Sequence, residues 1–578
     1  MNKKIILLLS VLCSYGLAQA DDFTLVRRAN RRFNAATVRD GATDRCVRQE
    51  LAEQPTNGDE WLYPDFRGSY GKGLKQLATG FVDPAAYESL LFALATGKSS
   101  DFDKILMGTA DPVMNRRLVS PQAALGFNLG GADSWIHSIA APPAVASAEK
   151  AGEMVELYWM ALLRDQRFDD YTGAVVTRAV EDMNALSDFK GPKNGAGMVT
   201  AETLFRSNVP GATIGNYISQ FLLQTVNFSD TDFLQQYVTP GTNLFMATLV
   251  NWANIQTGAN PLEGPVTFDP AQYIDRIRDL ANFVHADPPQ LPYLFALLIL
   301  VGWAKDTAGG GGNAVLDQNN PYISNPTQES FAEFFKPQAA ALVSQAVDMA
   351  LHAAWYQKWM VHRTIRPEYF GWLVHNQRLF NANPATGFDS GLHADVTGSR
   401  VVNEGATGAA IANNISLFNA NLIGGPGTYL LPQAFPEGSP LHPTYPAGHA
   451  TVGGAAVTIL KALFNEDFEI PQAGVGIRAK VVDPGDATML MNYAGAALTI
   501  GNELNKLAAN IAYGRNMAGV HYRSDAEASL RLGEAVAISL LEDWAYTMNI
   551  DFKGFSLTKF DGTKITVGAK KVMPGLPR

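Results

Sequence analysis

Three short stretches of this sequence concentrate cationic and imidazole side chains suited to binding an oxyanion. They lie at residues 358–366, 442–449 and 515–525. A lysine, two arginine forks, a glycine N–H and two histidines can together satisfy nearly every oxygen of a tetrahedral oxyanion. Any one stretch alone is most often structural, because a single lysine or histidine is usually solvated or satisfied within the fold. All three in one chain predict an oxyanion pocket.

The elements that must position these side chains are helix ends. Lys358 is predicted inside a long apolar helix, and Arg366 stands where Pro367 takes the chain out of helical geometry. Gly448 and His449 open another predicted helix, where free backbone N–H groups and the helix dipole favour an anion. The first two stretches are therefore expected to present their donors at helix termini.

The third stretch leads into the last long helix. Ser524 and Glu527 form a predicted capping box at its start, with Arg515 and His521 just upstream. Asp525, in the first turn, is placed to orient the imidazole of His521 and to set its tautomer. We therefore expect Asp525 to fix the orientation of His521.

Helical periodicity dominates the rest of the chain, so the predicted fold is mainly α, built from packed helical bundles. Strand alternation is recognised only around the Asp561-Gly562 turn near the C-terminus. The predicted regions are a signal peptide (1–20), an N-terminal mostly helical region (21–325), a C-terminal helical bundle with the pocket (326–550) and a β-hairpin tail (551–578). Helices are predicted near residues 147–164, 214–226, 271–284, 290–303, 337–365, 449–464, 489–513 and 524–548.

The N-terminus has the anatomy of a secretory signal peptide. Lys3 and Lys4 precede an apolar run at 5–17 that is too short to span a bilayer, and residues 18–20 read Ala-Gln-Ala. Export to the periplasm or the medium is therefore expected. Losing two lysines takes the formal charge from −10 to −12, which argues against nucleic acid or an anionic membrane surface as partner. The mature chain keeps only Cys46, so it forms no internal disulfide, and stabilisation by homo-oligomer assembly is expected.

The three stretches resemble the signature of the vanadium haloperoxidase and acid phosphatase superfamily. They read Lys-X7-Arg-Pro, Pro-X-Gly-His and Arg-X5-His-X3-Asp. Within that superfamily the chain looks most like the algal-type bromoperoxidases. The Lys-to-Arg spacing is one residue longer, Trp355 stands three residues before Lys358, and His442 stands seven before His449. Residues 143–171 are also similar to that branch.

The resemblance implies the fold of the vanadium haloperoxidases and a vanadate cofactor. It implies that His521 bonds the vanadium, and that Lys358, Arg366, Arg515 and the Gly448 amide neutralise the vanadate oxygens.

Further roles follow from the same resemblance. His449 would bind the apical hydroxide and exchange protons with incoming peroxide. Asp525 would lie behind His521, and Asp287 behind one arginine. Trp355 and His442 would line the approach of the halide, with Lys358 polarising a peroxide oxygen.

The implied reaction is halide oxidation by hydrogen peroxide. Bromide or iodide would be oxidised to hypohalous acid, which halogenates small organic acceptors. One position departs from the family pattern: Ala447 stands where the family has serine. The missing hydroxyl removes one neutral hydrogen bond, worth about 0.5–1.5 kcal/mol.

Two alternatives remain open from the sequence. The same pocket could serve an acid phosphatase in which His521 accepts the phosphoryl group. The chain could also be a secreted helical protein that keeps a vestigial pocket, with Ala447 as the first lost piece. Vanadate-dependent halide oxidation separates these alternatives from the haloperoxidase.

Overall fold

A computed structural model shows a predominantly helical molecule, as predicted. The structure describes residues 31–109, 116–241, 243–261, 267–306, 311–385, 388–403, 414–473, 476–548 and 550–568. The predicted signal peptide lies outside these residues. None of the helices in these ranges has both the length and the apolar character needed to cross a bilayer.

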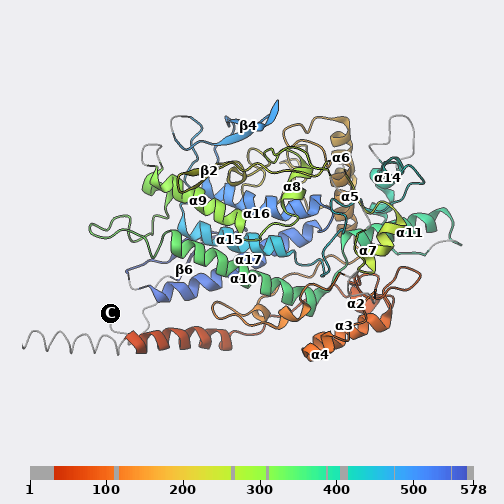
Figure 1. Ribbon diagram of the computed structural model, residues 1–578, viewed down its shortest axis with the longest axis horizontal. Coiled ribbons are helices and arrows are strands. Elements are labelled where there is room, and N and C mark those ends of the chain that lie inside the picture. Colours follow the sequence, from red (N-terminus) through yellow and green to blue (C-terminus); the bar gives the residue numbers. More distant parts are fainter. Residues whose placement is uncertain are drawn as a thin grey trace, which may run out of the picture.

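Four long helices form the centre of the molecule and run along its longest axis (Figure 1). They are α10 (Lys336–Tyr356), α15 (Gly448–Leu463), α16 (Ile500–Met517) and α17 (Arg523–Thr547). Pro337 stands in the first turn of α10, as expected, because proline needs no N–H partner there. Every residue of α15 except His449 is buried, so α15 is the core of the bundle.

Helices α15 and α17 touch backbone to backbone at two glycines. A Cβ placed on Gly454 of α15 would lie 2.1 Å from the Leu530 carbonyl oxygen, and one on Gly533 of α17 would lie 1.9 Å from that of Thr451. Both distances are far below any contact that a real Cβ makes. The crossing therefore requires glycine at both positions, and it fixes how the N-terminal ends of α15 and α17 lie relative to each other.

We expect Gly533→Ala to destabilise the protein by about 3 kcal/mol, because overpacking a close crossing forces the backbone to shift. Thermal unfolding of the variant should begin several degrees below that of the wild type. Gly195→Ala is the matched control, since a Cβ there meets nothing within 4 Å. Equal unfolding temperatures for both variants would contradict the requirement for glycine.

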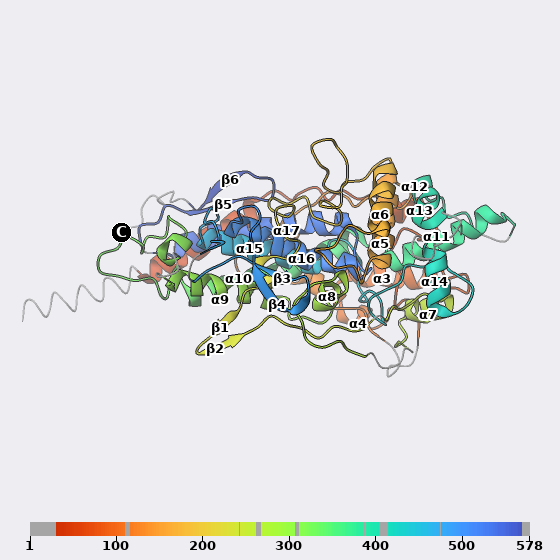
Figure 2. The ribbon, with the colours of Figure 1, turned by 90° about the horizontal axis from the view of Figure 1, so that it is seen from above.

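The remaining elements lie beside this bundle and beyond one of its ends, as Figure 2 shows from above. A helix also covers residues 31–48. The other elements are α2 (Asp59–Leu62), α3 (Pro84–Thr96), α4 (Ser99–Phe102), η1 (Pro121–Leu125), η2 (Ser134–Ile136), α5 (Ala148–Leu162), α6 (Ala174–Ala185), η3 (Gln220–Leu222), β1 (Val226–Phe228), β2 (Thr231–Phe233), α7 (Leu249–Gln256), α8 (Ile277–Phe283), α9 (Leu291–Lys305), η4 (Gly312–Val315), η5 (Gln357–His362), α11 (Pro367–Ala382), α12 (Ala394–Gly398), α13 (Arg400–Asn403), α14 (Ile415–Ile423), β3 (Lys480–Asp483), β4 (Asp486–Asn492), β5 (Phe555–Thr558) and β6 (Lys564–Val567).

The helix predicted at residues 214–226 is wrong, because only the short 3₁₀ turn η3 forms there. Gly215 takes a positive φ of 68°, which interrupts helical geometry. The backbone N–H groups of Ser219 and Gln220 donate instead to the side chains of Asn510 and Glu503 on α16. Hydrogen bonds from a neighbouring helix thus replace those of a local helix.

The structure also contains more strand than predicted. The C-terminal hairpin β5–β6 is confirmed, with Phe555 opposite Val567. Two further antiparallel pairs, β1–β2 and β3–β4, were missed. The helix predicted over 489–513 begins only at Ile500, because its first residues belong to β4.

Two helix boundaries near the pocket differ from prediction. Helix α17 begins at Arg523, and the Asp525 side chain accepts the N–H of Tyr522 at 3.1 Å, so Asp525 caps the helix rather than Ser524. Pro367 does not close the α10 segment but opens α11, with Arg366 as its N-cap. The division into four regions stays a prediction, although helices from both sides of residue 325 pack together, such as α8 on α16.

Candidate oxyanion site

The first predicted stretch is shaped by a π-helical turn. Helix α10 continues into η5, which carries Lys358, and η5 ends where Arg363 adopts a left-handed φ of 38°. π turns widen a helix by one residue and are frequent at functional sites. The chain then re-enters a helix at α11, so that Arg366 lies beside the N-terminus of α11.

Arg366 connects all three stretches. Its Nε donates to the His442 carbonyl at 2.9 Å and its Nη1 to the Val520 carbonyl at 2.8 Å. Nη1 also lies 3.0 Å from Nε2 of His521, and Nη2 lies 2.8 Å from Nδ1 of His442. Burial lowers the pKa of Arg366 to about 10, so the side chain is a buried cation at neutral pH.

Lys358 is fully buried and points toward the second stretch. Its Nζ donates to the carbonyls of Pro443 and Thr444 at 2.7 and 2.8 Å. Burial and the charge of Arg366 hold the pKa of Lys358 well below its usual value. An anion beside this amine would stabilise its charged form.

His521 has a defined tautomer in this arrangement. Its Nδ1 lies 2.8 Å from Oδ2 of Asp525, which also accepts a hydrogen bond from the Thr444 hydroxyl. Nδ1–H therefore donates to the carboxylate, and Nε2, which faces the Arg366 donor, carries the lone pair. Burial, Arg366 and Lys358 lower the pKa of His521 well below its usual value, so the ring is neutral. A neutral imidazole held by a carboxylate is a typical metal ligand.

His449 lies at the start of α15 and is more open to solvent, with 22% of its side chain exposed. Its Nε2 is 2.8 Å from Oδ1 of Asp287. Burial opposes ionisation of Asp287, but His449 and Arg515 outweigh it and hold its pKa below the usual value. The structure therefore pairs Asp287 with His449, whereas the sequence had placed it behind an arginine. Gly448 begins α15, whose first N–H groups have no partner within the helix.

Arg515 has a donor left over. It lies in the last turn of α16, where Nη1 donates to the Val284 carbonyl at 2.5 Å, and its guanidinium lies over the Phe435 ring. Its buried Nε has no hydrogen-bond partner among the described residues. Burial and the charge of Arg366 lower the pKa of Arg515 to about 10. A buried cationic N–H without an acceptor is the feature that an oxyanion would satisfy.

Trp355 and His442, both predicted to line the approach of the halide, lie together. Their ring centroids are 4.9 Å apart, and the Trp355 indole N–H donates to the Val119 carbonyl at 3.1 Å. Burial and the charges of Lys358 and Arg366 hold the pKa of His442 well below its usual value. His442 therefore presents a neutral ring beside the cations.

The sequence reasoning missed two hydroxyl groups that brace the site. Thr444 connects Lys358, through its carbonyl, to Asp525, through its hydroxyl. Ser529 lies one turn after Asp525 and accepts the N–H of Ala447 at 2.7 Å. Both hydroxyls donate within the protein, to the Asp525 side chain and carbonyl respectively. Neither hydroxyl is therefore free to replace the serine donor that is missing at Ala447. Thr444 could have been noticed from the sequence, because it lies within the stretch 442–449.

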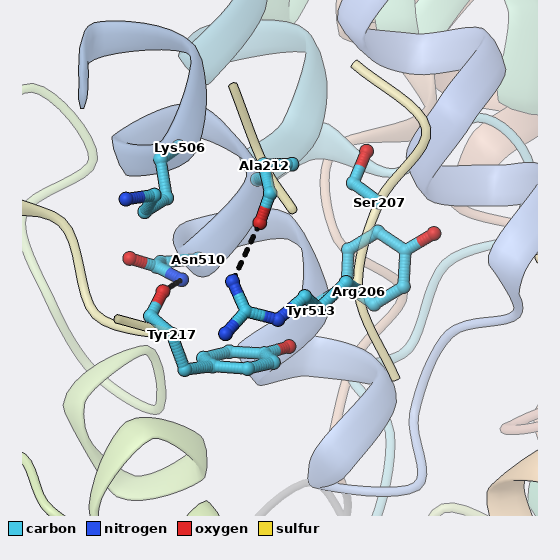
Figure 3. A pocket seen from close by; sticks show the side chains of 8 residues that line it. Arg206, Ser207, Ala212, Tyr217, Lys506, Asn510 and Tyr513 are labelled. Carbon is cyan, nitrogen blue, oxygen red and sulfur yellow. Dashed lines mark hydrogen bonds between the residues drawn. The ribbon is translucent and has the colours of Figure 1, made fainter. Parts of the chain in front are cut away.

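A separate cavity lies elsewhere along α16 (Figure 3). It is small and contains none of the predicted pocket residues. Arg206 at its wall donates to the carbonyls of Ala212 and Gly215, and Lys506 pairs with Glu503. Because none of the three stretches lines this cavity, it is not part of the candidate site.

Comparisons with known proteins identify the family of this chain. A family model for the second helical-bundle domain of VCPO matches residues 428–549, which contain the second and third stretches. The chain is 32% identical to the vanadium-dependent bromoperoxidase of Corallina officinalis, over 94% of this chain and 99% of that one. The chain belongs to the vanadium-dependent bromoperoxidase family.

Two further relatives, both from Ascophyllum nodosum, extend this result. The vanadium-dependent bromoperoxidase of Ascophyllum nodosum is 31% identical over 82% of each chain. The solved homohexameric structure of the second vanadate-dependent bromoperoxidase of the same organism superposes with a TM-score of 0.81 at 28% identity. It covers 93% of this chain and 90% of that one. The predicted family and the predicted fold of a vanadium-dependent bromoperoxidase are thereby confirmed, while the roles of single pocket residues stay predictions.

The donor set of this site fits a vanadate or phosphate ion. Lys358, Arg366 and Arg515 outnumber the carboxylates of Asp287 and Asp525. The unpartnered Nε of Arg515 and the first N–H groups of α15 add directed donors. An oxyanion would therefore find both charge and hydrogen bonds here.

We expect anion binding to be coupled to proton uptake by Lys358. Its pKa is lowered in the protein without the anion, and a bound anion raises it again. Protons are therefore taken up at pH values between that lowered pKa and the usual lysine value, and affinity falls as pH rises through this window. Calorimetry of phosphate binding to the vanadate-free protein, in buffers of different ionisation enthalpy, measures this uptake. Lys358→Met should reduce it, and unchanged uptake in that variant would contradict the assignment.

Proposed function

We propose that this protein is a vanadate-dependent haloperoxidase that oxidises bromide and/or iodide with hydrogen peroxide. The product is hypohalous acid, which halogenates small organic acceptors. The observation that supports this most is His521: a neutral imidazole whose Nε2 faces a cluster of buried cations and whose Nδ1–H is fixed by Asp525. Membership of the bromoperoxidase family favours this chemistry over the phosphatase and vestigial alternatives.

The residues that would hold vanadate come from all three stretches. His521 would bond the vanadium through Nε2, and Lys358, Arg366, Arg515 and the Gly448 N–H would bind its oxygens. Bound vanadate supplies a Lewis-acidic vanadium(V) that activates hydrogen peroxide for attack by halide. Shielding by the surrounding helices strengthens each charge-assisted bond, because little water competes for the donors.

His449 and Asp287 form the group that would handle the peroxide proton. A general base must lie within hydrogen-bond reach of the proton that it takes, and a carboxylate partner stabilises the imidazolium that results. His449 is partly exposed, so it can receive peroxide from solvent, while Asp287 holds its orientation at 2.8 Å. Trp355 and His442 would then line the halide approach.

Two wider features belong to the same proposal. The Lys-rich start, apolar run and Ala-Gln-Ala sequence at the N-terminus support secretion to the periplasm or medium. The relative from Ascophyllum nodosum is homohexameric, which supports homo-oligomer assembly of this chain.

His521→Ala is expected to abolish halide oxidation, because it removes the one side chain proposed to bond vanadium directly. Activity should be measured after vanadate loading with chloride, bromide and iodide side by side. We expect wild-type oxidation of bromide or iodide, with chloride the poorest substrate. Near-normal turnover in His521→Ala would contradict the role, and phosphate-ester hydrolysis without any halide oxidation would favour the phosphatase.

Arg515→Ala should weaken vanadate retention far more than Ala447→Ser alters it. The arginine supplies charge-assisted hydrogen bonds, which are about twice as strong as neutral ones, whereas serine at 447 restores one neutral bond of about 0.5–1.5 kcal/mol. Equilibrium dialysis against vanadate compares the two variants with the wild type. If Ala447→Ser converted an inactive wild type into an active enzyme, the vestigial alternative would be favoured.

A further inference from the structure

One short turn contacts two residues of the oxyanion site at once. It follows α8 and runs from Val284 to Asp287. The Val284 carbonyl accepts the Nη1 hydrogen of Arg515 at 2.5 Å, and the Asp287 carboxylate lies 2.8 Å from His449. Any displacement of this turn would therefore disturb an oxyanion donor and the proposed peroxide base together.

His285, in the middle of this turn, is held from outside the pocket. Its Nε2 lies 2.7 Å from Oε1 of Glu437, and its ring stacks on Phe435 with centroids 3.7 Å apart and planes 6° apart. Phe435 is the same ring over which the Arg515 guanidinium lies, at 5.5 Å. His285 thus joins the turn to the segment that packs against Arg515.

The anchor at Glu437 is itself well fixed. Its backbone carbonyl accepts hydrogen bonds from Nζ of Lys72 at 3.0 Å and from Nη1 of Arg116 at 3.2 Å. Burial opposes ionisation of Glu437, but the hydrogen bond and charge of His285, a backbone hydrogen bond and the charge of Arg116 together outweigh it and hold its pKa below the usual value. The carboxylate is therefore a charged acceptor for the His285 ring.

The contact is not part of the closed core. His285 has 32% and Glu437 24% of its side chain exposed, so both lie where solvent reaches. Removing the His285 ring takes away its contacts with Phe435 and Glu437, so its effect should concentrate on the turn.

We propose that His285 is a positioning residue for this site. By clamping the 284–287 turn to Phe435 and Glu437, it holds the Val284 carbonyl against Arg515 and the Asp287 carboxylate against His449. It thereby sets the affinity for the oxyanion and the orientation of His449 toward peroxide. This inference rests on the proposed function, but its first effect is on anion binding, which needs no turnover.

The test combines vanadate binding with a kinetic separation. His285→Ala should weaken vanadate binding about tenfold in equilibrium dialysis, because a displaced Arg515 would lose about one charge-assisted hydrogen bond to the anion. With vanadate saturating, the KM for peroxide should rise more than kcat falls. His285→Gln can still donate to Glu437 and should recover part of both losses.

His393→Ala is the matched control. His393 is also a half-exposed histidine beside a carboxylate, Asp395, and none of its contacts reaches the pocket. Wild-type vanadate affinity and peroxide KM in His285→Ala, or equal losses in His393→Ala, would overturn the positioning role while leaving the proposed function intact. Failure of the wild type to bind vanadate would overturn the proposed function itself, and the positioning role with it.

Discussion

Burying three cations beside one another is the constraint on which this structure depends. Lys358, Arg366 and Arg515 are almost inaccessible to solvent, and desolvation lowers the pKa of each. Two carboxylates and a ring of backbone carbonyls compensate only part of that charge. Such an arrangement is costly for stability alone, so its value lies in the attraction that it keeps for a bound anion.

The need to bury these cations explains why the pocket lies at helix ends. Carbonyl acceptors must come from irregular backbone, because carbonyls inside a helix are already engaged. The acceptors of Lys358 and Arg366 accordingly lie at Pro443, Thr444, His442 and Val520, in the segments just before α15 and α17. The glycine crossing at Gly454 and Gly533 holds these two segments at a constant separation.

The residues of the site could be predicted from sequence because their chemistry is local. Each stretch carries its own donors, and the order of the stretches is distinctive even without coordinates. The partners could not be predicted in the same way: Val284 acts through its carbonyl, and His285 contacts Glu437 at a separation of 152 residues. Backbone acceptors and distant pairs leave no pattern in a single sequence.

The errors in the predicted fold have a similar origin. Apolar periodicity suggested a helix at 214–226, but a positive-φ glycine and side chains from α16 determine that backbone instead. Arg366 was placed at the end of one helix, whereas Pro367 makes it the N-cap of the next. The first error thus came partly from contacts with α16, and the second from the position of a proline that can either end one helix or begin the next.

The π turn that carries Lys358 can accommodate the extra residue in the Lys358-to-Arg366 spacing. An extra residue in an α-helix rotates everything beyond it by about 100°. A π turn takes up one additional residue within a single loop of the helix, so the longer Lys-to-Arg spacing need not swing Arg366 away from Lys358. A relative with the shorter spacing is expected to lack this turn. Insertion or deletion of one residue at 357–362 can thus change the length of the chain while Lys358 and Arg366 keep their relative positions.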